Sequence, residues 1–314
     1  MRLLRAALAQ PSHAYLFTGP PHVGKTTTAM AFAQALNCAG ESSGCGICLE
    51  CRALLHGNHP DVRFVQASEG KKVFALEDLR QLIEEVSWKP LRGRHKVYVL
   101  PNDLLNLQGA NALLKTLEEP SPGTILILLA TSTDRVLPTL VSRCQLVPFG
   151  PVAPQAIAEW LISHHDQDPM RAQHLARISD GRIGWAAEQA HSKEDVEPAP
   201  LWGQTYASML STAEALAQEE TDQQIVALEA LIAQVRDIMV YLQTGRTDWI
   251  AEPPKAIAAA RWVSSLSYWW RCIRRLEEAR LQVLGHANGK LLWTVLAGDL
   301  LPTARELAEK AASR

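Results

Sequence analysis

The sequence predicts an α/β domain with a parallel sheet, followed by a region built only of helices. Three observations predict this fold class. Short apolar segments alternate with amphipathic ones over the first 150 residues, the pattern of a parallel sheet covered by helices. A glycine-rich segment, GPPHVGKTT, lies between the first strand and the first long helix. After Phe149 the strand patterns stop and helical periodicity continues.

Length and composition fit an ordinary globular protein of two domains or more. The chain has 314 residues, of which 47% are hydrophobic and 20% charged, and its formal charge is −2. This balance argues against a protein that binds DNA through an overall basic surface. The opening MRLLRAALAQPSHAY is too interrupted for a signal peptide, and no apolar run approaches the roughly 20 residues of a membrane span. We therefore expect a cytoplasmic protein with reduced or metal-bound cysteines.

The first region contains an amphipathic helix predicted in MRLLRAALAQPSHAY, then five predicted strands and three further predicted helices. The strands are short apolar runs, and one of them, TILILLAT, is typical of a central parallel strand. The helix over 75–88 places apolar residues three and four positions apart, and the last helix is stopped by Pro120. The strands are predicted at 14–19, 61–67, 97–100, 124–131 and 144–149, and the helices at 25–36, 75–88 and 109–120.

The second region divides into a small and a larger group of helices. Residues 151–190 fit three short helices, and the charged, proline-containing HSKEDVEPAP is a predicted linker. Long helices are predicted over 225–242 and 256–284. The expected domains are thus 1–150, a helical lid over 151–192 and a helical C-terminal domain over 200–314.

The segment from Gly19 to Thr27 has the full pattern of a phosphate-binding loop. Its glycines, Gly19 and Gly24, let backbone N–H groups face a phosphate at a helix N-terminus. Lys25 is expected to reach the β- and γ-phosphates of ATP and Thr26 to bind Mg²⁺, while Thr27 completes the nucleotide-binding motif. ADP is the other candidate nucleotide. A chance glycine-rich turn is the alternative, but the strand before and the helix after favour a nucleotide loop.

Four cysteines follow within fourteen residues, in CAGESSGCGICLEC. The two-residue gaps allow neighbouring thiolates to converge on one ion, and four thiolates form the closed tetrahedral shell of structural zinc. Four free thiols or two disulfides are the alternatives, and the expected cytosolic location disfavours both. The predicted Zn²⁺ ligands are Cys38, Cys45, Cys48 and Cys51.

The strand over 97–100 ends without the acids that a nucleotide hydrolase needs. Such a strand is expected to end in an Asp that holds Mg²⁺ and a Glu that activates water, but Pro101 and Asn102 follow here. Asp103 lies one residue further, and a one-residue step turns a side chain to the other face of a strand. It would replace the missing acid only if the backbone shifted at Pro101.

Several motifs together resemble one family. The phosphate loop with its cysteine insertion, LRQLIEEVSWKP, KVYVL, ANALLKTLEEP and LLATSTDRVLPTLVSRC are similar to bacterial clamp-loader subunits, which are AAA+ proteins that place the sliding clamp on primed DNA. The resemblance is dense over 13–150 and thinner beyond. It implies an AAA+ domain, a three-helix lid and a C-terminal collar that oligomerises. The length and the final HANGKLLWTVLAGDLL favour a stator-like subunit over a hydrolysing one.

The resemblance also implies a degenerate ATPase. In hydrolysing relatives an arginine that senses the γ-phosphate stands where this chain has Gly184, and Arg182 is off register. Thr131 falls near the family's sensor-1 position, but has no catalytic task without the acids. Arg143, in VSRC, matches the arginine that reaches the ATP of the adjacent subunit in the family. An ordinary arginine at a helix C-terminus is the alternative.

The resulting hypothesis is a non-hydrolysing clamp-loader subunit of DNA polymerase III that supplies Arg143 to a neighbour. Its expected partners are gamma/tau-like ATPase subunits and a delta-like subunit, with the clamp and primed DNA reached through the complex. A competent ATPase subunit rescued by Asp103 and a nucleotide-switched module outside replication are the alternatives. The basic clusters at 92–96 and 274–280 are more often solvated faces than DNA contacts.

Overall fold

The computed structural model describes residues 2–40, 43–65, 74, 76–102, 105–191, 202, 206–247, 250, 253–284, 288–303 and 306. The chain folds into two compact units. The first comprises residues 1–152 together with 181–184, and the second comprises 153–180 and 185–314. Among the described residues, no helix combines the length and the apolar character needed to cross a bilayer.

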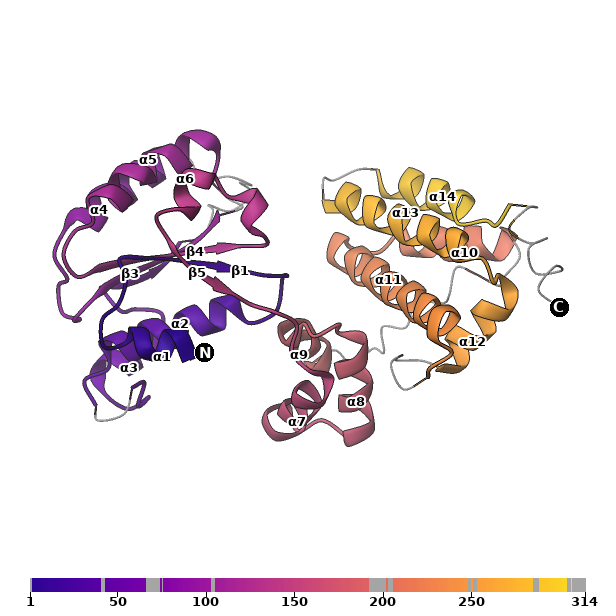
Figure 1. Ribbon diagram of the computed structural model, residues 1–314, viewed down its shortest axis with the longest axis horizontal. Coiled ribbons are helices and arrows are strands. Elements are labelled where there is room, and N and C mark those ends of the chain that lie inside the picture. Colours follow the sequence, from indigo (N-terminus) through magenta and orange to yellow (C-terminus); the bar gives the residue numbers. More distant parts are fainter. Residues whose placement is uncertain are drawn as a thin grey trace. The chain divides into compact units, whose positions relative to one another are not determined.

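A five-stranded sheet forms the centre of the first unit (Figure 1). All strand pairs are parallel, in the order β2-β3-β4-β1-β5, which confirms the predicted fold class. The central strands are buried along their whole length because their apolar runs are covered on both faces. The strands are β1 (Ala14–Thr18), β2 (Val62–Phe64), β3 (Lys96–Pro101), β4 (Thr124–Ala130) and β5 (Gln145–Pro148).

Helices cover both faces of this sheet, as Figure 1 shows. Side chains alternate along β1, so Tyr15 and Phe17 enter one hydrophobic core and Leu16 enters the other. Tyr15 meets Phe32 edge-to-face, with ring centroids 5.2 Å apart. One face carries α1 (Arg2–Ala7), α2 (Lys25–Asn37) and α3 (Leu49–Leu55), and the other carries α4 (Leu76–Ser87), α5 (Leu107–Glu118) and α6 (Pro138–Val141).

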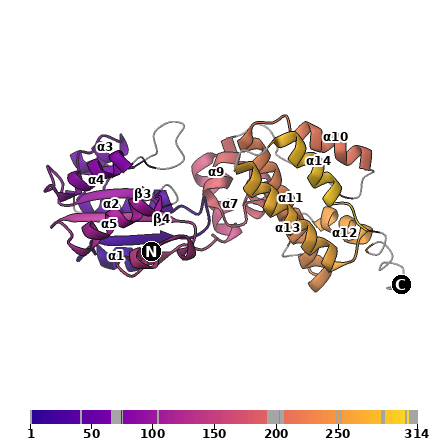
Figure 2. The ribbon, with the colours of Figure 1, turned by 90° about the horizontal axis from the view of Figure 1, so that it is seen from above.

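After β5 the described residues form helices, as the sequence predicts. Their division into separate domains stays a prediction, and residues 192–200 of the predicted linker lie outside the described part of the chain. In both views α11 packs beside α13, around buried Leu231 and Trp269 (Figure 2). The helices are α7 (Pro154–His165), α8 (Pro169–Ile178), α9 (Ile183–His191), α10 (Tyr206–Leu216), α11 (Thr221–Thr244), α12 (Pro253–Trp262), α13 (Leu266–Leu284) and α14 (Gly289–Asp299).

The prediction of one continuous helix over 256–284 is wrong. The chain leaves the helical path between α12 and α13, where Val263 ends one helix through its N–H bond to the Ala259 carbonyl. The Val263 carbonyl instead accepts a hydrogen bond from Nε1 of buried Trp269, at 2.9 Å. Ser265 and Ser267 join their hydroxyls at 2.8 Å next to this break. A side-chain donor from the next helix thus replaces a backbone bond that sequence periodicity assumes.

Candidate functional site

The phosphate-loop segment leaves the carboxyl edge of the sheet at the end of β1. The N–H of Gly19 donates to the Ala130 carbonyl at 3.2 Å, which ties the start of the loop to the end of β4. Gly19 has φ 150°, and a Cβ there would lie 2.2 Å from the Phe149 carbonyl oxygen, so only glycine fits. Gly24, with φ 91°, precedes the first turn of α2. The structure therefore places the predicted loop between a strand and a helix.

The side chain of Lys25 turns back onto this loop. Its Nζ donates to the carbonyls of Gly19 and Pro20, both at 2.6 Å. Thr26 and Thr27 lie in the first turn of α2. A phosphate that enters the loop must compete with these two carbonyls for the ammonium donors.

At the end of β3 the amide of Asn102 has a structural role. The residue is only 6% exposed, and its Nδ2 donates to the Arg135 carbonyl at 3.2 Å. A carboxylate has no proton to donate, so an acid at position 102 would leave this carbonyl without its partner. Asp103 lies outside the described residues.

The lid position expected to hold an arginine lies directly on the phosphate loop. The N–H of Gly184 donates to the His22 carbonyl at 2.7 Å. A Cβ at Gly184 would lie 3.0 Å from that carbonyl oxygen, tighter than almost all real Cβ contacts, so this backbone leaves little room for a side chain. Arg182 lies in the turn before α9. Across the edge, Thr131 Oγ1 is buried and makes no hydrogen bond to a described residue.

Arg143 follows α6 and is fixed by three contacts within its own chain. Its Nη1 donates to the Thr139 carbonyl at 3.0 Å and to Ser142 Oγ at 3.4 Å. Its Nη2 donates to Glu118 Oε1 at 2.6 Å, where it forms an ion pair with the end of α5. The predicted alternative, an arginine that satisfies a helix C-terminus, describes the Thr139 contact.

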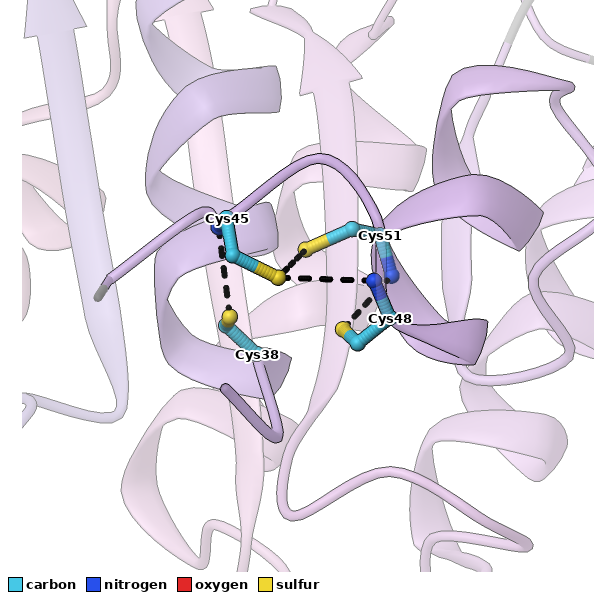
Figure 3. Close-up of side chains that lie close together, drawn as sticks. All are labelled: Cys38, Cys45, Cys48 and Cys51. Atoms are coloured by element: carbon cyan, nitrogen blue, oxygen red, sulfur yellow. Dashed lines mark hydrogen bonds between the residues drawn. The ribbon is translucent and has the colours of Figure 1, made fainter. Parts of the chain in front are cut away.

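The four predicted zinc ligands converge (Figure 3). Their sulfur atoms lie within 4.8 Å of one another, and the Sγ atoms of Cys45 and Cys51 are 3.9 Å apart. All four are free thiols, which excludes the two-disulfide alternative in this structure. A Zn–S bond of about 2.3 Å separates the sulfur atoms of a tetrahedron by about 3.8 Å. The donor set and its spacing therefore fit one structural zinc ion.

Backbone N–H groups support three of these sulfur atoms. The backbone N–H of each later cysteine donates to the Sγ of the cysteine before it in the cluster, in each case at 3.4 Å. The pairs are Cys45 to Cys38, Cys48 to Cys45, and Cys51 to Cys48. The N–H groups of Cys51 and Ala39 hold the pKa of the Cys48 thiol at about 6, and burial raises the pKa of Cys51 to about 12. A bound metal deprotonates its coordinating thiols outright, so both cysteines are available as ligands.

A buried carboxylate fastens the segment beyond the cysteines to a distant loop, and sequence reasoning missed it. Asp61, 1% exposed, accepts hydrogen bonds from the N–H groups of Leu91, Arg92 and Gly93 at 2.6, 2.7 and 2.7 Å. Burial alone would raise the pKa of Asp61, but these three donors bring the pKa below its usual value. Glu50, in α3 beside two of the cysteines, pairs with Arg92 at 3.1 Å. The polar DVR at the start of β2 was the only sequence signal.

Comparison with known proteins assigns the first unit. Residues 3–153 match the family described as DNA polymerase III, delta subunit. Through this domain, just under half of the chain, the sequence resembles that family. It is 36% identical over 188 residues to the delta' subunit of Bacillus subtilis, a match that covers 59% of this chain and 56% of that protein. It is 34% identical over 238 residues to the tau subunit of Escherichia coli, covering 72% of this chain and 35% of tau.

The resemblance to this family rests on these sequence matches. A gamma-subunit-related protein of Thermotoga maritima superposes with a TM-score of 0.46 at 15% identity, covering 95% of this chain and 96% of that one. The chain spans about half the length of the delta' relatives that it matches. Delta' and tau relatives match at similar identity, so these comparisons do not distinguish a likeness to delta' from a likeness to tau.

Proposed function

We propose that this chain is a delta'-like subunit of the DNA polymerase III clamp loader that does not hydrolyse ATP itself. In this proposal it assembles with gamma/tau-like ATPase subunits and a delta-like subunit. The complex acts on the sliding clamp and primed DNA. The chain contributes Arg143 to the nucleotide of a neighbouring ATPase subunit.

One observation carries the proposal. Asn102 stands where a hydrolysing subunit needs an acid, and its amide donates to the Arg135 carbonyl in a contact that a carboxylate cannot make. Gly184 supports the same conclusion, because its backbone lies against His22 where a γ-phosphate-sensing arginine would have to project. Without acids the site cannot hold Mg²⁺ or orient a water molecule as phosphoryl transfer requires.

The chemistry assigned to Arg143 is electrostatic. A guanidinium placed beside the γ-phosphate of a neighbour's ATP neutralises the charge that develops during transfer. Its planar donors match phosphate oxygens, which an ammonium does not do in a fixed geometry. The arginine follows α6 on a short turn after Pro138–Val141, so it depends on packed secondary structure for its position.

The cysteine cluster is proposed to hold structural zinc. A closed shell of four thiolates leaves no open position for a substrate, and metal binding contributes folding free energy to a segment that has few apolar residues of its own. The phosphate loop is proposed to be a vestige that ATP or ADP can occupy without turnover. The cytosolic location expected from the sequence stays a prediction.

Two alternatives differ from this proposal in what they require. A gamma/tau-like ATPase requires metal binding by Asp103, which lies outside the described residues, and hydrolysis by the isolated chain. A nucleotide-switched module outside replication requires no loader partners, and the family assignment disfavours it. Turnover by the purified chain and capture of loader subunits separate these possibilities.

The deciding experiment compares Arg143→Ala with Lys25→Ala in the reconstituted loader. We expect the Arg143→Ala protein to assemble and to slow ATP hydrolysis in the neighbouring subunit's site that Arg143 contacts. The rate there should fall by a factor of up to about 10³–10⁵ if this arginine is the only group that stabilises the charge on the γ-phosphate. The loss in total ATP turnover should be smaller, because the other ATP sites of the loader continue to hydrolyse ATP. Lys25→Ala should change the rate much less, since its own loop does no chemistry. If Lys25→Ala abolishes loading while Arg143→Ala has no effect, the proposed roles are reversed.

A further inference from the structure

The guanidinium of Arg143 is already bound by an anion of its own chain. Glu118 Oε1 lies 2.6 Å from Nη2, and the Thr139 carbonyl lies 3.0 Å from Nη1. Both terminal nitrogens, the donors that a phosphate would take, are therefore engaged within this chain. An arginine in this arrangement cannot give the same donors to a triphosphate until Glu118 releases it.

The helix itself does not favour an acid at this position. Glu118 is the last residue of α5, where the negative end of the helix dipole disfavours a carboxylate. Pro120 follows within two residues and prevents the helix from continuing. The pair with Arg143 is the favourable interaction that offsets the unfavourable place of Glu118. Arg143 thus has a defined anionic partner 25 residues away in sequence.

The pair is accessible to a competing anion. The Arg143 side chain is 35% exposed and that of Glu118 is 50% exposed. Water screens ion pairs at such exposure, and they typically change an equilibrium by no more than about fivefold. A triphosphate carries more charge than one carboxylate and offers several oxygens to the planar guanidinium. The contact is therefore weak enough to be exchanged when a neighbour's nucleotide arrives.

We propose that Glu118 competes with the neighbour's nucleotide for Arg143. Glu118 holds the guanidinium on its own chain, and the γ-phosphate of the adjacent subunit displaces the carboxylate when the interface closes. Glu118 thereby slows hydrolysis in the neighbouring subunit's ATP site until the nucleotide is bound there and the interface has closed. This inference rests on the proposed function of Arg143, and Glu118 acts only through that residue.

The test measures ATP hydrolysis by the reconstituted loader that contains Glu118→Gln. We expect the rate at subsaturating ATP to rise about two- to fivefold, mainly through a lower KM, because the competitor for Arg143 is weakened. Glu119→Gln is the matched control: it removes the same charge from the adjacent position, which makes no ion pair with a described residue. It should leave KM and kcat unchanged.

A double variant separates competition from a merely structural role. In the Arg143→Ala background, Glu118→Gln should change neither KM nor kcat, since no guanidinium remains to be released. An equal effect of Glu118→Gln with and without Arg143 would overturn the inference, as would a rate equal to or below wild type. If Arg143→Ala alone leaves hydrolysis unchanged, the proposed function itself fails. If only Arg143→Ala has an effect, the function stands and the competition is absent.

Discussion

The cysteine cluster and the phosphate-binding loop of the first unit are both complete as sequence motifs, but the remaining groups of an ATPase site are missing from the sequence. In the cluster, all ligand atoms come from Cys38 to Cys51, and the structure brings the four sulfur atoms within 4.8 Å. The nucleotide edge, formed by the phosphate loop (19–27), Asn102, Thr131 and Gly184, takes its groups from four segments that are distant in sequence. There the phosphate loop keeps its strand–loop–helix form, while Asn102 and Gly184 make contacts with their own chain.

This difference shows what a short motif can and cannot establish. A cluster confined to fourteen residues contains its whole site, so an intact pattern implies an intact site. An ATPase site requires the loop, the acids and the lid arginine together, and loss of any one removes chemistry without changing the loop. In the proposed function, the same fold therefore keeps the zinc site and loses the ATPase site.

The largest expected effect comes from Cys51→Ser. Structural zinc in small domains contributes about 10–16 kcal/mol of binding free energy, which is also folding free energy for the segment that binds it. We expect metal content, measured by elemental analysis of protein purified without chelators, to fall from one zinc per chain to near zero. Limited proteolysis should then cut within 38–55.

Cys144→Ser is the control for this prediction, since Cys144 lies outside the cluster. It should retain one zinc per chain. Wild-type protein without zinc would show that the complete cysteine motif does not form a metal site, and the proposed difference between the cysteine cluster and the nucleotide edge would be wrong. Retention of zinc by Cys51→Ser would show that the shell has fewer than four necessary ligands.

Local sequence patterns predict the sheet and the phosphate loop. The features that the sequence does not predict depend on contacts between residues that are distant in the chain. The apolar run of β4 and the glycines of the loop determine strand and turn through their own side chains, so the sheet could be predicted. The break after Trp262 depends on Trp269 donating to the Val263 carbonyl, and the restraint on Arg143 depends on Glu118. No sequence period encodes such pairs, because tertiary packing brings them together.

The cysteine cluster should keep its zinc even when the neighbouring contact of Asp61 is weakened. Asp61→Asn keeps the shape of the side chain but removes the charge that accepts three backbone N–H groups. We expect unfolding free energy to fall by about 2–4 kcal/mol in denaturant titrations, because hydrogen bonds to charged groups are strong and the donors are left poorly paired. Zinc content should remain at one per chain, and Asp134→Asn, an exposed change of the same kind, should have almost no effect.

The stability difference between the wild-type protein and the Asp61→Asn variant should depend on pH. The folded pKa of Asp61 is lowered, so its stabilisation is fully present above the unfolded value of about 3.9. It is lost as pH falls through the folded pKa, where the carboxylate takes up a proton. The two proteins should thus differ most near pH 6–7 and converge below about pH 4. A difference that stays constant down to about pH 3 would exclude the charge as its cause.

The smallest expected effect comes from restoring both acids at the nucleotide edge, Pro101→Asp with Asn102→Glu. The buried amide loses its bond to the Arg135 carbonyl, so we expect a loss of about 1–3 kcal/mol in unfolding free energy. Asn111→Glu, on the exposed side of α5, makes a similar chemical change without that contact and should cost less than about 0.5 kcal/mol.

ATP hydrolysis by the isolated double variant should stay at background, because Gly184 supplies no lid arginine and no neighbour supplies a finger. Turnover well above the wild-type chain would mean that the acids alone were missing. Two substitutions would then be enough to restore activity to the nucleotide edge. Its difference from the cysteine cluster would lie in residues 101 and 102 alone, and not in the need to assemble a site from four distant segments.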